Sequence, residues 1–331
     1  MNKDEKNSTP KWRLPAEWEP QSGVQLTWPH SGTDWAPMLQ EVTQTYLAMA
    51  QEISKREPLL TVRNEDIPTN DTWARDHGFL TLTDDQSHFR LLDFCFNGWG
   101  RKFPADKDNA INRQLFERGC LHGAYVDCLD FVLEGGAIES DGKGTIFTTS
   151  HCLLAPKRNQ PLTKEEISEK LVRFLGAENV IWIEHGQLTG DDTDGHIDTL
   201  VRICPDDTLL YISCEDRADE QYEELQLMEE QLHALRTKNG QPYRLMKLPL
   251  PRPIYDGEDR LPATYANFLI INGAVLCPTY GQSDLDSEAL SVIDETFPGR
   301  EVVGIDCRPL IRQHGSLHCC TMQFPAGVLT L

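Results

Sequence analysis

Apolar segments that end in a polar residue recur along the chain and indicate a repeated structural unit. Each segment combines a strand-like apolar run with a turn, and its polar or aromatic tip serves as a marker. The markers are Trp28, Asp76, Glu134, His196, Asn267 and Cys319. They recur about every 60 residues, which is longer than common solenoid repeats and suits a repeated β-β-α-β unit.

Turn signals divide three of these segments into β-hairpins. Asp-Gly and Asn-Gly pairs are strong signals for tight hairpin turns. They occur at Asp141-Gly142 and Asn272-Gly273, each between two apolar runs. A third turn is predicted at Pro205-Asp206-Asp207, between apolar runs that together extend from His196 to Ser213.

Amphipathic patterns between the hairpins predict helices over residues 35–54, 164–175 and 219–238. Asn239-Gly240 is a plausible C-cap for the last of them. Since strands and helices alternate throughout, the fold class is α/β or α+β, and periodicity alone leaves the topology open.

The composition is strongly acidic, which narrows the classes of partner. The 331 residues carry 31 basic and 52 acidic side chains, for a formal net charge of -21. Nucleic acid is therefore not expected as a partner, because binding phosphates requires a basic surface. An acidic surface raises the local concentration of a cationic substrate, although it also serves solubility alone.

We expect a cytoplasmic protein with no membrane association. The N-terminus lacks the apolar core of a signal peptide, and no run reaches the length of a membrane span. The ten cysteines form no C-x-x-C pair, so neither a zinc site nor a disulfide framework is indicated. Residues 1–13 are predicted to be a disordered arm, and residues 14–331 a single catalytic domain.

Cys319 and Cys320 are the first candidates for chemistry, in a strand-like stretch near the C-terminus. Neighbours on a strand point to opposite faces, so one cysteine should face the core and the other a site. A thiolate can serve as a nucleophile. A purely structural role for both thiols is the alternative.

His196 and Asp198 are two residues apart, so on a strand they would share one face. This pattern suits a proton-transferring histidine beside a carboxylate that binds a cation. It also suits a metal site or a polar loop that enters a strand. Glu134 ends an apolar run before Gly135 and Gly136, which suggests either a carboxylate aimed at a tight pocket or a simple turn.

Trp73, Arg75 and Asp76 lie within four positions of one another. The indole ring and the carboxylate could hold a guanidinium between them. The alternative is a structural Arg–Asp pair. Each of these clusters is a weak signal alone, but all of them occur at matching places in the repeat.

Taken together, these motifs resemble the agmatine deiminase family, also called Porphyromonas-type peptidylarginine deiminases. The resemblance runs from about Pro15 to the C-terminus. It is carried by Asn70-Asp71-Thr72-Trp73-Ala74-Arg75-Asp76, Glu134-Gly135-Gly136-Ala137-Ile138, Asp192-Thr193-Asp194-Gly195-His196-Ile197-Asp198 and Leu317-His318-Cys319-Cys320-Thr321. It implies the pentein fold, a five-bladed α/β-propeller of ββαβ units around a central site. Six markers suit five blades if the first and last segments share a blade.

The resemblance also implies roles for the candidate residues. Cys319 is expected to be the nucleophile, His196 the general acid/base, and Glu134 the group that orients His196. Asp76 and Asp198 are expected to bind the guanidinium of a small cationic substrate, with Trp73 and Asp71 completing the substrate-binding set. Neither a metal nor an organic cofactor is expected, and assembly into a homo-oligomer is left open.

The implied reaction converts agmatine to N-carbamoylputrescine and ammonia through an amidino-cysteine intermediate, a step in putrescine biosynthesis. Deimination of free or peptidyl arginine is one alternative. A metallohydrolase using His196, Asp198 and Glu134 is another, and a non-catalytic pentein binding module is a third. One residue departs from the family pattern: His314 stands in an element before the cysteine that is usually rich in glycine.

Overall fold

Five three-stranded sheets build the fold, and they all repeat one pairing pattern. The computed structural model describes residues 11–330. In every sheet the middle strand pairs antiparallel with one neighbour and parallel with the other. Among the described residues no sheet closes on itself, and the fold is mixed α/β.

Each of these five sheets has three strands, which are named below in the order in which they are hydrogen-bonded to one another. In spatial order the sheets are β17-β1-β2 (Thr321–Pro325, Gln21–Thr27, Leu59–Val62), β3-β4-β5 (Leu80–Thr83, Phe89–Cys95, Ala124–Val132), β6-β7-β8 (Ile138–Ser140, Thr145–Thr149, Asn179–Ile183), β9-β10-β11 (Val201–Cys204, Thr208–Ser213, Arg244–Pro249) and β14-β15-β16 (Leu269–Ile271, Ala274–Thr279, Glu301–Asp306). A small separate hairpin consists of β12 (Tyr255–Asp256) and β13 (Asp259–Arg260).

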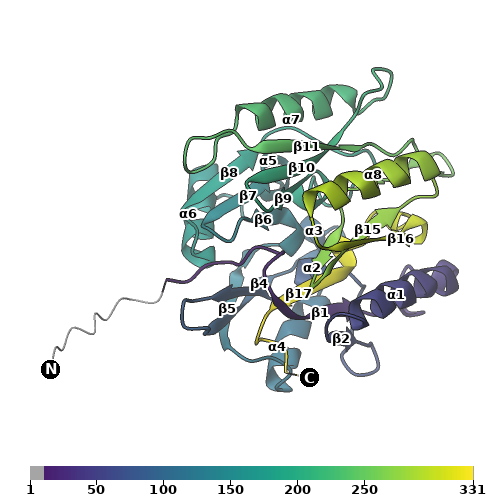
Figure 1. The fold of residues 1–331 in the computed structure, drawn as a ribbon. Helices are drawn as coiled ribbons and strands as arrows, with labels where there is room; N and C mark the ends of the chain where they lie inside the picture. Colours follow the sequence, from purple (N-terminus) through teal and green to yellow (C-terminus); the bar gives the residue numbers. More distant parts are fainter. Residues whose placement is uncertain (1–10, 331) are drawn as a thin grey trace.

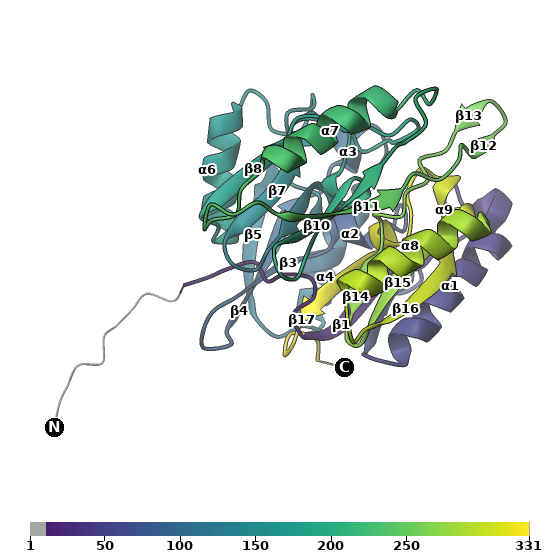
Figure 2. The same cartoon turned by 45° about the horizontal axis from the view of Figure 1, so that its top comes forward.

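A helix connects the two parallel strands of each sheet, as parallel pairing requires a crossover. These helices are α1 (Leu39–Ser54), α4 (Ile111–Glu117), α6 (Lys164–Leu175), α7 (Tyr222–Ala234) and α8 (Ser283–Thr296). The longer ones lie at the outside of the molecule, with the strands toward its centre (Figures 1 and 2). The predicted ββαβ unit is therefore present five times.

The first unit is assembled from both ends of the chain. Strand β1 pairs antiparallel with β17, with Leu26 opposite Thr321. The first and last marker segments thus share one sheet. This sharing explains why the sequence has six markers but only five units.

The predicted hairpins are confirmed, because each turn sequence separates the antiparallel pair of its sheet. The helix predicted over 164–175 is also confirmed. Thr163 and Glu166 form a capping box at its start, and Gly176 ends it with φ +64°. Helix α1 begins at Leu39, after a 3-10 turn over Ala36–Met38 (η1).

The helix predicted over 219–238 is shorter than expected. It spans Tyr222–Ala234, and Leu235 already has an extended backbone. The proposed C-cap at Asn239-Gly240 is wrong. Gly240 instead lies in a tight turn, closed by the isolated pairing of Arg236 with Pro242.

The predicted N-terminal arm over residues 1–13 lies mostly outside the described residues. Its last residue contacts the body: Arg13 pairs through its main chain with Thr83, at 3.0 Å in both directions. The Arg13 guanidinium also forms an ion pair with Glu19. In the described part of the chain, no helix combines the length and apolar character needed to cross a bilayer.

Candidate active site

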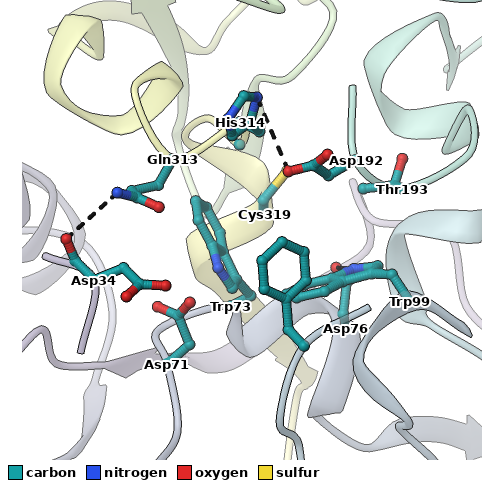
Figure 3. Close-up of a pocket in the computed structure, with 12 residues that line it drawn as sticks. Asp34, Asp71, Trp73, Asp76, Trp99, Asp192, Thr193, Gln313, His314 and Cys319 are labelled. Carbon is teal, nitrogen blue, oxygen red and sulfur yellow. Dashed lines mark hydrogen bonds and ion pairs between the residues drawn. The ribbon is translucent and has the colours of Figure 1, made fainter. Parts of the chain in front are cut away.

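A pocket opens among short helices and loops (Figure 3). Its lining comes from segments that are far apart in the sequence. The lining residues are Asp34, Asp71, Trp73, Asp76, Trp99, Phe103, Asp192, Thr193, Gln313, His314, Gly315 and Cys319. The pocket therefore brings together four of the predicted residues: Asp71, Trp73, Asp76 and Cys319.

Five of the sequence markers hold equivalent positions in the five sheets. Asp76, Glu134, His196, Asn267 and Cys319 each lie a few residues before the first strand of a different sheet. The short helices that carry or flank four of them are α2 (Ala74–His77) and the 3-10 turns η3 (Gly135–Ala137), η4 (Ile197–Thr199) and η5 (His318–Cys320). A repeated fold thus delivers one polar side chain from each unit to a common centre.

Asp76 is buried and lies at the middle of this cluster. Its Oδ2 accepts a hydrogen bond from the indole nitrogen of Trp99 at 2.9 Å, and its Oδ1 accepts one from the Gly136 amide at 3.1 Å. His196 Nδ1 lies 3.6 Å from Oδ1. Burial raises the pKa of Asp76 to about 6. Trp99 was not predicted from the sequence, yet it both lines the pocket and orients this carboxylate.

Gly136 allows three functional side chains to converge. A Cβ at this position would lie 2.6 Å from His196 Nδ1, 3.0 Å from Asp76 Oδ1 and 3.1 Å from Asp198 Oδ2. The three atoms therefore surround one point, and any side chain at residue 136 would occupy it. This packing explains the glycine after Glu134-Gly135 better than a simple turn does.

His196 is fully buried, and neither ring nitrogen has a hydrogen-bond partner among the described residues. Of the predicted alternatives, the polar loop that enters a strand is the observed one, and a strand that carries both His196 and Asp198 is not formed. His196 is the residue before η4, and Asp198 lies within that turn. Burial opposes protonation of the ring, but the Asp76 carboxylate and the neighbouring Cys152 sulfur raise the pKa of His196 well above its ordinary value.

Glu134 does not hydrogen-bond to His196, although atoms of the two side chains lie within 4.8 Å of each other. Its carboxylate accepts hydrogen bonds from Arg158 Nε at 3.0 and 3.3 Å. Arg158 in turn bonds to Asp194 at 2.6 Å, in the loop before His196. Glu134 therefore contributes charge beside His196, and through Arg158 it is linked to the loop that carries the ring.

Asp198 is held by His318, the residue before the predicted nucleophile. Asp198 Oδ2 lies 2.7 Å from His318 Nδ1, while Oδ1 is buried and has no hydrogen-bond partner within residues 11–330. Burial acts to raise the pKa of Asp198, but the hydrogen bond and charge of His318 outweigh it, so the pKa is lowered. Asp198 thus stays ionised with one oxygen available to a ligand.

The side chains of Cys319 and Cys320 face different surroundings, as predicted, but the reason is not the alternation of a strand. They lie in the 3-10 turn η5 and not on a strand. Successive side chains of a 3-10 helix are about 120° apart, so neighbours still face different surroundings. Cys319 lines the pocket, with its sulfur 3.4 Å from Asn267 Oδ1. Cys320 is completely buried.

Burial, followed by the carboxylates of Asp198 and Asp76, raises the pKa of Cys319 well above its ordinary value. In these surroundings the nucleophile candidate is therefore a thiol at neutral pH. A cation between the sulfur and the two carboxylates would reverse the electrostatic part of this effect.

Trp73, Gly315 and His314 shape one wall of the pocket. A Cβ on Gly315 would lie 2.2 Å from the Trp73 ring, so only glycine permits this contact. His314, the residue that departs from the family pattern, has φ +64°. Its Nδ1 donates to the carbonyl of Gly190 at 2.7 Å and lies 3.9 Å from Asp192 (Figure 3). The histidine thus adopts a backbone conformation that usually favours glycine.

Asp71 faces the pocket from the segment before α2. Its Oδ1 accepts hydrogen bonds from the Trp35 indole nitrogen and the Thr72 amide, both at 2.8 Å. Burial raises the pKa of Asp71 to about 6. Trp35 has no polar role visible in the sequence, because its contact with Asp71 joins positions 36 residues apart.

The metallohydrolase set His196, Asp198 and Glu134 is not grouped as a metal site. Two clusters among residues 11–330 hold three possible ligands within 4.8 Å of one another: Glu134, Cys152 and His196; and Glu17, Glu139 and His318. Asp198 belongs to neither cluster, and Cys152 was not predicted.

The sequence matches the Porphyromonas-type peptidyl-arginine deiminase family over residues 13–325. A Porphyromonas gingivalis structure, provisionally named an arginine deiminase, is 50% identical with a TM-score of 0.92, covering 97% of this chain and 100% of that one. A cysteine-to-serine variant of C. jejuni agmatine deiminase, with substrate bound, is 37% identical with a TM-score of 0.88, covering 95% and 96%.

A Pseudomonas aeruginosa agmatine deiminase is 32% identical over 96% of this chain and 98% of its own length. A dimethylarginine dimethylaminohydrolase structure shares only 13% identity, with a TM-score of 0.52 over 92% of this chain and 100% of that one. That last likeness concerns the fold alone.

Proposed function

Since the chain belongs to the Porphyromonas-type peptidyl-arginine deiminase family, we propose that it is an agmatine deiminase. The reaction takes agmatine and water to N-carbamoylputrescine and ammonia. It breaks one C–N bond of the guanidinium and replaces that nitrogen with oxygen. Relatives named agmatine deiminase match this chain over nearly its whole length.

The negative charge of the pocket lining is the observation that favours agmatine as the substrate. The lining includes the carboxylates of Asp34, Asp71, Asp76 and Asp192, and none of its described residues is a lysine or arginine. Agmatine is a dication, with a guanidinium at one end and an ammonium at the other. Arginine adds a carboxylate near its amine, which this acidic wall would repel.

Lys102 is one candidate for binding an arginine carboxylate, but it is already paired. Its Nζ donates to the Asp192 carbonyl at 2.6 Å and to Asp194 Oδ1 at 2.8 Å. Engaging a substrate carboxylate would require breaking these bonds. This pairing supports a substrate without a carboxylate.

We assign guanidinium binding to Asp76 and Asp198. Both are buried, and Asp198 Oδ1 has no partner in the described part of the chain. Two carboxylates on one guanidinium form charge-assisted hydrogen bonds that fix its plane. Trp73 and Asp71 are assigned to contacts with the rest of the substrate molecule, because they line the same pocket as Asp76.

Cys319 then attacks the guanidinium carbon. Burial and the carboxylates of Asp198 and Asp76 hold the pKa of Cys319 high. The substrate cation offsets the effect of the carboxylates, so the thiolate forms more readily. The same cation disfavours the protonated form of His196, which lies beside Asp76. His196 can therefore accept the thiol proton and deliver it to the departing nitrogen as ammonia leaves.

Hydrolysis of the amidino-cysteine completes the cycle. His196 removes a proton from water, which attacks the same carbon. The C–S bond then breaks, and its electron pair returns to Cys319 as the ureido product forms. Glu134 acts through charge near His196, so it is a positioning residue in this scheme.

For the architecture, we propose that the five ββαβ units form a five-bladed propeller around this pocket. The repeated sheet pattern, and the delivery of one marker residue before each first strand, support this arrangement.

Ammonia release from agmatine, free arginine and a blocked arginine peptide tests the function. We expect turnover of agmatine and a kcat/KM at least about 10²-fold lower for the other two, since one mispaired buried charge costs that much. Cys319→Ser is the matched control and should release none. Equal or better turnover of arginine or the peptide would contradict the proposal.

A further inference from the structure

Cys152 lies beside His196, although the proposed reaction does not use it. We propose that Glu134, Cys152 and His196 form a binding site for a thiophilic divalent metal ion such as Zn²⁺, and that the bound metal blocks turnover. The inhibition rests on the proposed function of His196, whereas the metal site itself does not.

The geometry of the three side chains supports a metal site. Their ligand atoms lie within 4.8 Å of one another, and all three residues are buried. Cysteine sulfur, histidine nitrogen and carboxylate oxygen are the ligands that Zn²⁺ takes in proteins. Tetrahedral Zn²⁺ holds its ligands roughly 3.3–3.7 Å apart, so no pair of these atoms would have to close by more than about 1.5 Å.

The state of His196 is the second observation. Both ring nitrogens are buried and have no hydrogen-bond partner within residues 11–330. A buried polar group without a partner is costly, and a metal ion would satisfy one nitrogen.

The fold holds Cys152 at this place. Thr149 accepts a hydrogen bond from the Cys152 amide at 3.3 Å, which caps the short helix α5 (Ser150–Leu153). The same hydroxyl donates to the Gly195 carbonyl at 2.5 Å. One threonine therefore fixes the turn that carries Cys152 against the loop that carries His196.

The second cluster of possible ligands provides a contrast. In Glu17, Glu139 and His318, the ligand atoms already have partners. Arg202 bonds to Glu139 at 2.6 Å and to Glu17 at 2.9 Å, and His318 Nε2 lies 2.7 Å from Glu17. A metal ion there would have to displace a buried guanidinium. The site at His196 differs in its imidazole: both ring nitrogens of His196 lack a partner among the described residues, whereas both nitrogens of His318 are engaged. A metal ion there would share the Glu134 carboxylate with Arg158.

Metal binding has a direct consequence for the reaction. A ring nitrogen coordinated to Zn²⁺ cannot accept or deliver a proton, so turnover would stop at the first proton transfer. Thiolate and imidazole ligands favour Zn²⁺ and Co²⁺, whereas Mg²⁺ and Ca²⁺ favour oxygen. Inhibition should therefore be selective for the softer ions.

Co²⁺ binding tests the site independently of activity. In Cys319→Ala enzyme, which lacks the thiol that lines the pocket, we expect one Co²⁺ per chain and thiolate-to-cobalt absorption in the near ultraviolet. The absorption should vanish in Cys152→Ala/Cys319→Ala and in Cys152→Ser/Cys319→Ala. Two different replacements, each checked by circular dichroism, separate loss of a ligand from loss of folding. Cys128→Ala/Cys319→Ala, which removes a buried cysteine outside both clusters, should retain the absorption.

Zn²⁺ inhibition is then measured with Cys319 intact, relative to the metal-free rate of each variant. The concentration for half inhibition should rise by on the order of 10-fold or more in Cys152→Ala, because loss of even an outer partner weakens metal affinity by that much. Mg²⁺ should not inhibit. No thiolate absorption in Cys319→Ala, or equal Zn²⁺ sensitivity of Cys152→Ala and unsubstituted enzyme, would overturn the proposal. If agmatine is not turned over, the Co²⁺ result still decides the site.

Discussion

Gly136→Ala tests whether the convergence of three side chains over Gly136 is needed for catalysis. The added methyl would lie 2.6 Å from His196 Nδ1 and about 3 Å from carboxylate oxygens of Asp76 and Asp198. An ordinary contact of this kind needs roughly 3.5 Å, so the ring or the backbone must move by about 0.9 Å. The backbone of Gly136 is not in the left-handed region, so the effect is steric.

The size of the loss follows from this displacement. A misplacement of about 1 Å in a catalytic group costs on the order of 10²-fold in rate. Here one methyl group displaces the proton carrier and both guanidinium ligands, so we expect kcat to fall at least about 10²-fold. Overpacking should also lower the free energy of unfolding by roughly 1–3 kcal/mol.

The assay is ammonia release from agmatine, with thermal unfolding measured in parallel. Gly304→Ala is the matched control. Its methyl would lie 2.9 Å from Thr279 Cγ2, in the sheet β14-β15-β16, again without a positive φ. Gly304 is exposed, and the methyl meets only the end of a side chain. This variant should keep kcat within about threefold, because changes away from a site act on stability alone.

The reasoning would be refuted if Gly136→Ala, like Gly304→Ala, kept kcat within about threefold of the unsubstituted enzyme. The three side chains would then tolerate the methyl group, and their positions around Gly136 would not be required for turnover.

Four further predictions concern the same site. Cys319→Ser should abolish ammonia release while Cys320→Ser retains a substantial fraction, and equal losses would contradict the division between pocket and core. Asp76→Asn and Asp198→Asn should each reduce kcat/KM by roughly 10²-fold, given the strength of charged hydrogen bonds. The affinity for agmatine, measured by calorimetry in a Cys319→Ala background, should fall in parallel. Normal affinity would contradict guanidinium binding by these two carboxylates. The pKa of Asp76 is raised to about 6, so kcat/KM should fall as pH drops through about 6, because protonation removes the charge that binds the cation. If Asp76 causes this fall, the Asp71→Asn enzyme should show the same fall of kcat/KM at low pH. Exhaustive dialysis against a chelator should leave full activity, and a loss restored by zinc or manganese would favour a metal-dependent hydrolase.

The repeat and its turns could be predicted from the sequence because their signals are local. Asp141-Gly142 and Asn272-Gly273 specify tight turns through their own backbone preferences. The helix over 164–175 is bounded by its capping box and Gly176. Such features need no partner from elsewhere in the chain, so they can be read from a short window of residues.

The candidate residues were identified through the family resemblance, and their local conformations were partly mispredicted. His196 and Cys319 were expected on strands, but they lie at 3-10 turns that precede strands. Strand alternation describes paired backbone, whereas these residues precede the first paired residue of their sheets. Tertiary contacts, and not periodicity, determine the backbone there.

Only the tertiary structure revealed the partners of these residues. Trp99 orients Asp76 across 23 positions, Arg158 bonds to Glu134 across 24, and His318 holds Asp198 across 120. Cys152 likewise lies beside His196 only because Thr149 fixes α5 to the following repeat. The sequence by itself determined which units form and which of their residues carry reactive groups. The packing of five units against one another decided which groups meet, because a hydrogen bond depends on distance in space and leaves no periodic trace in the chain.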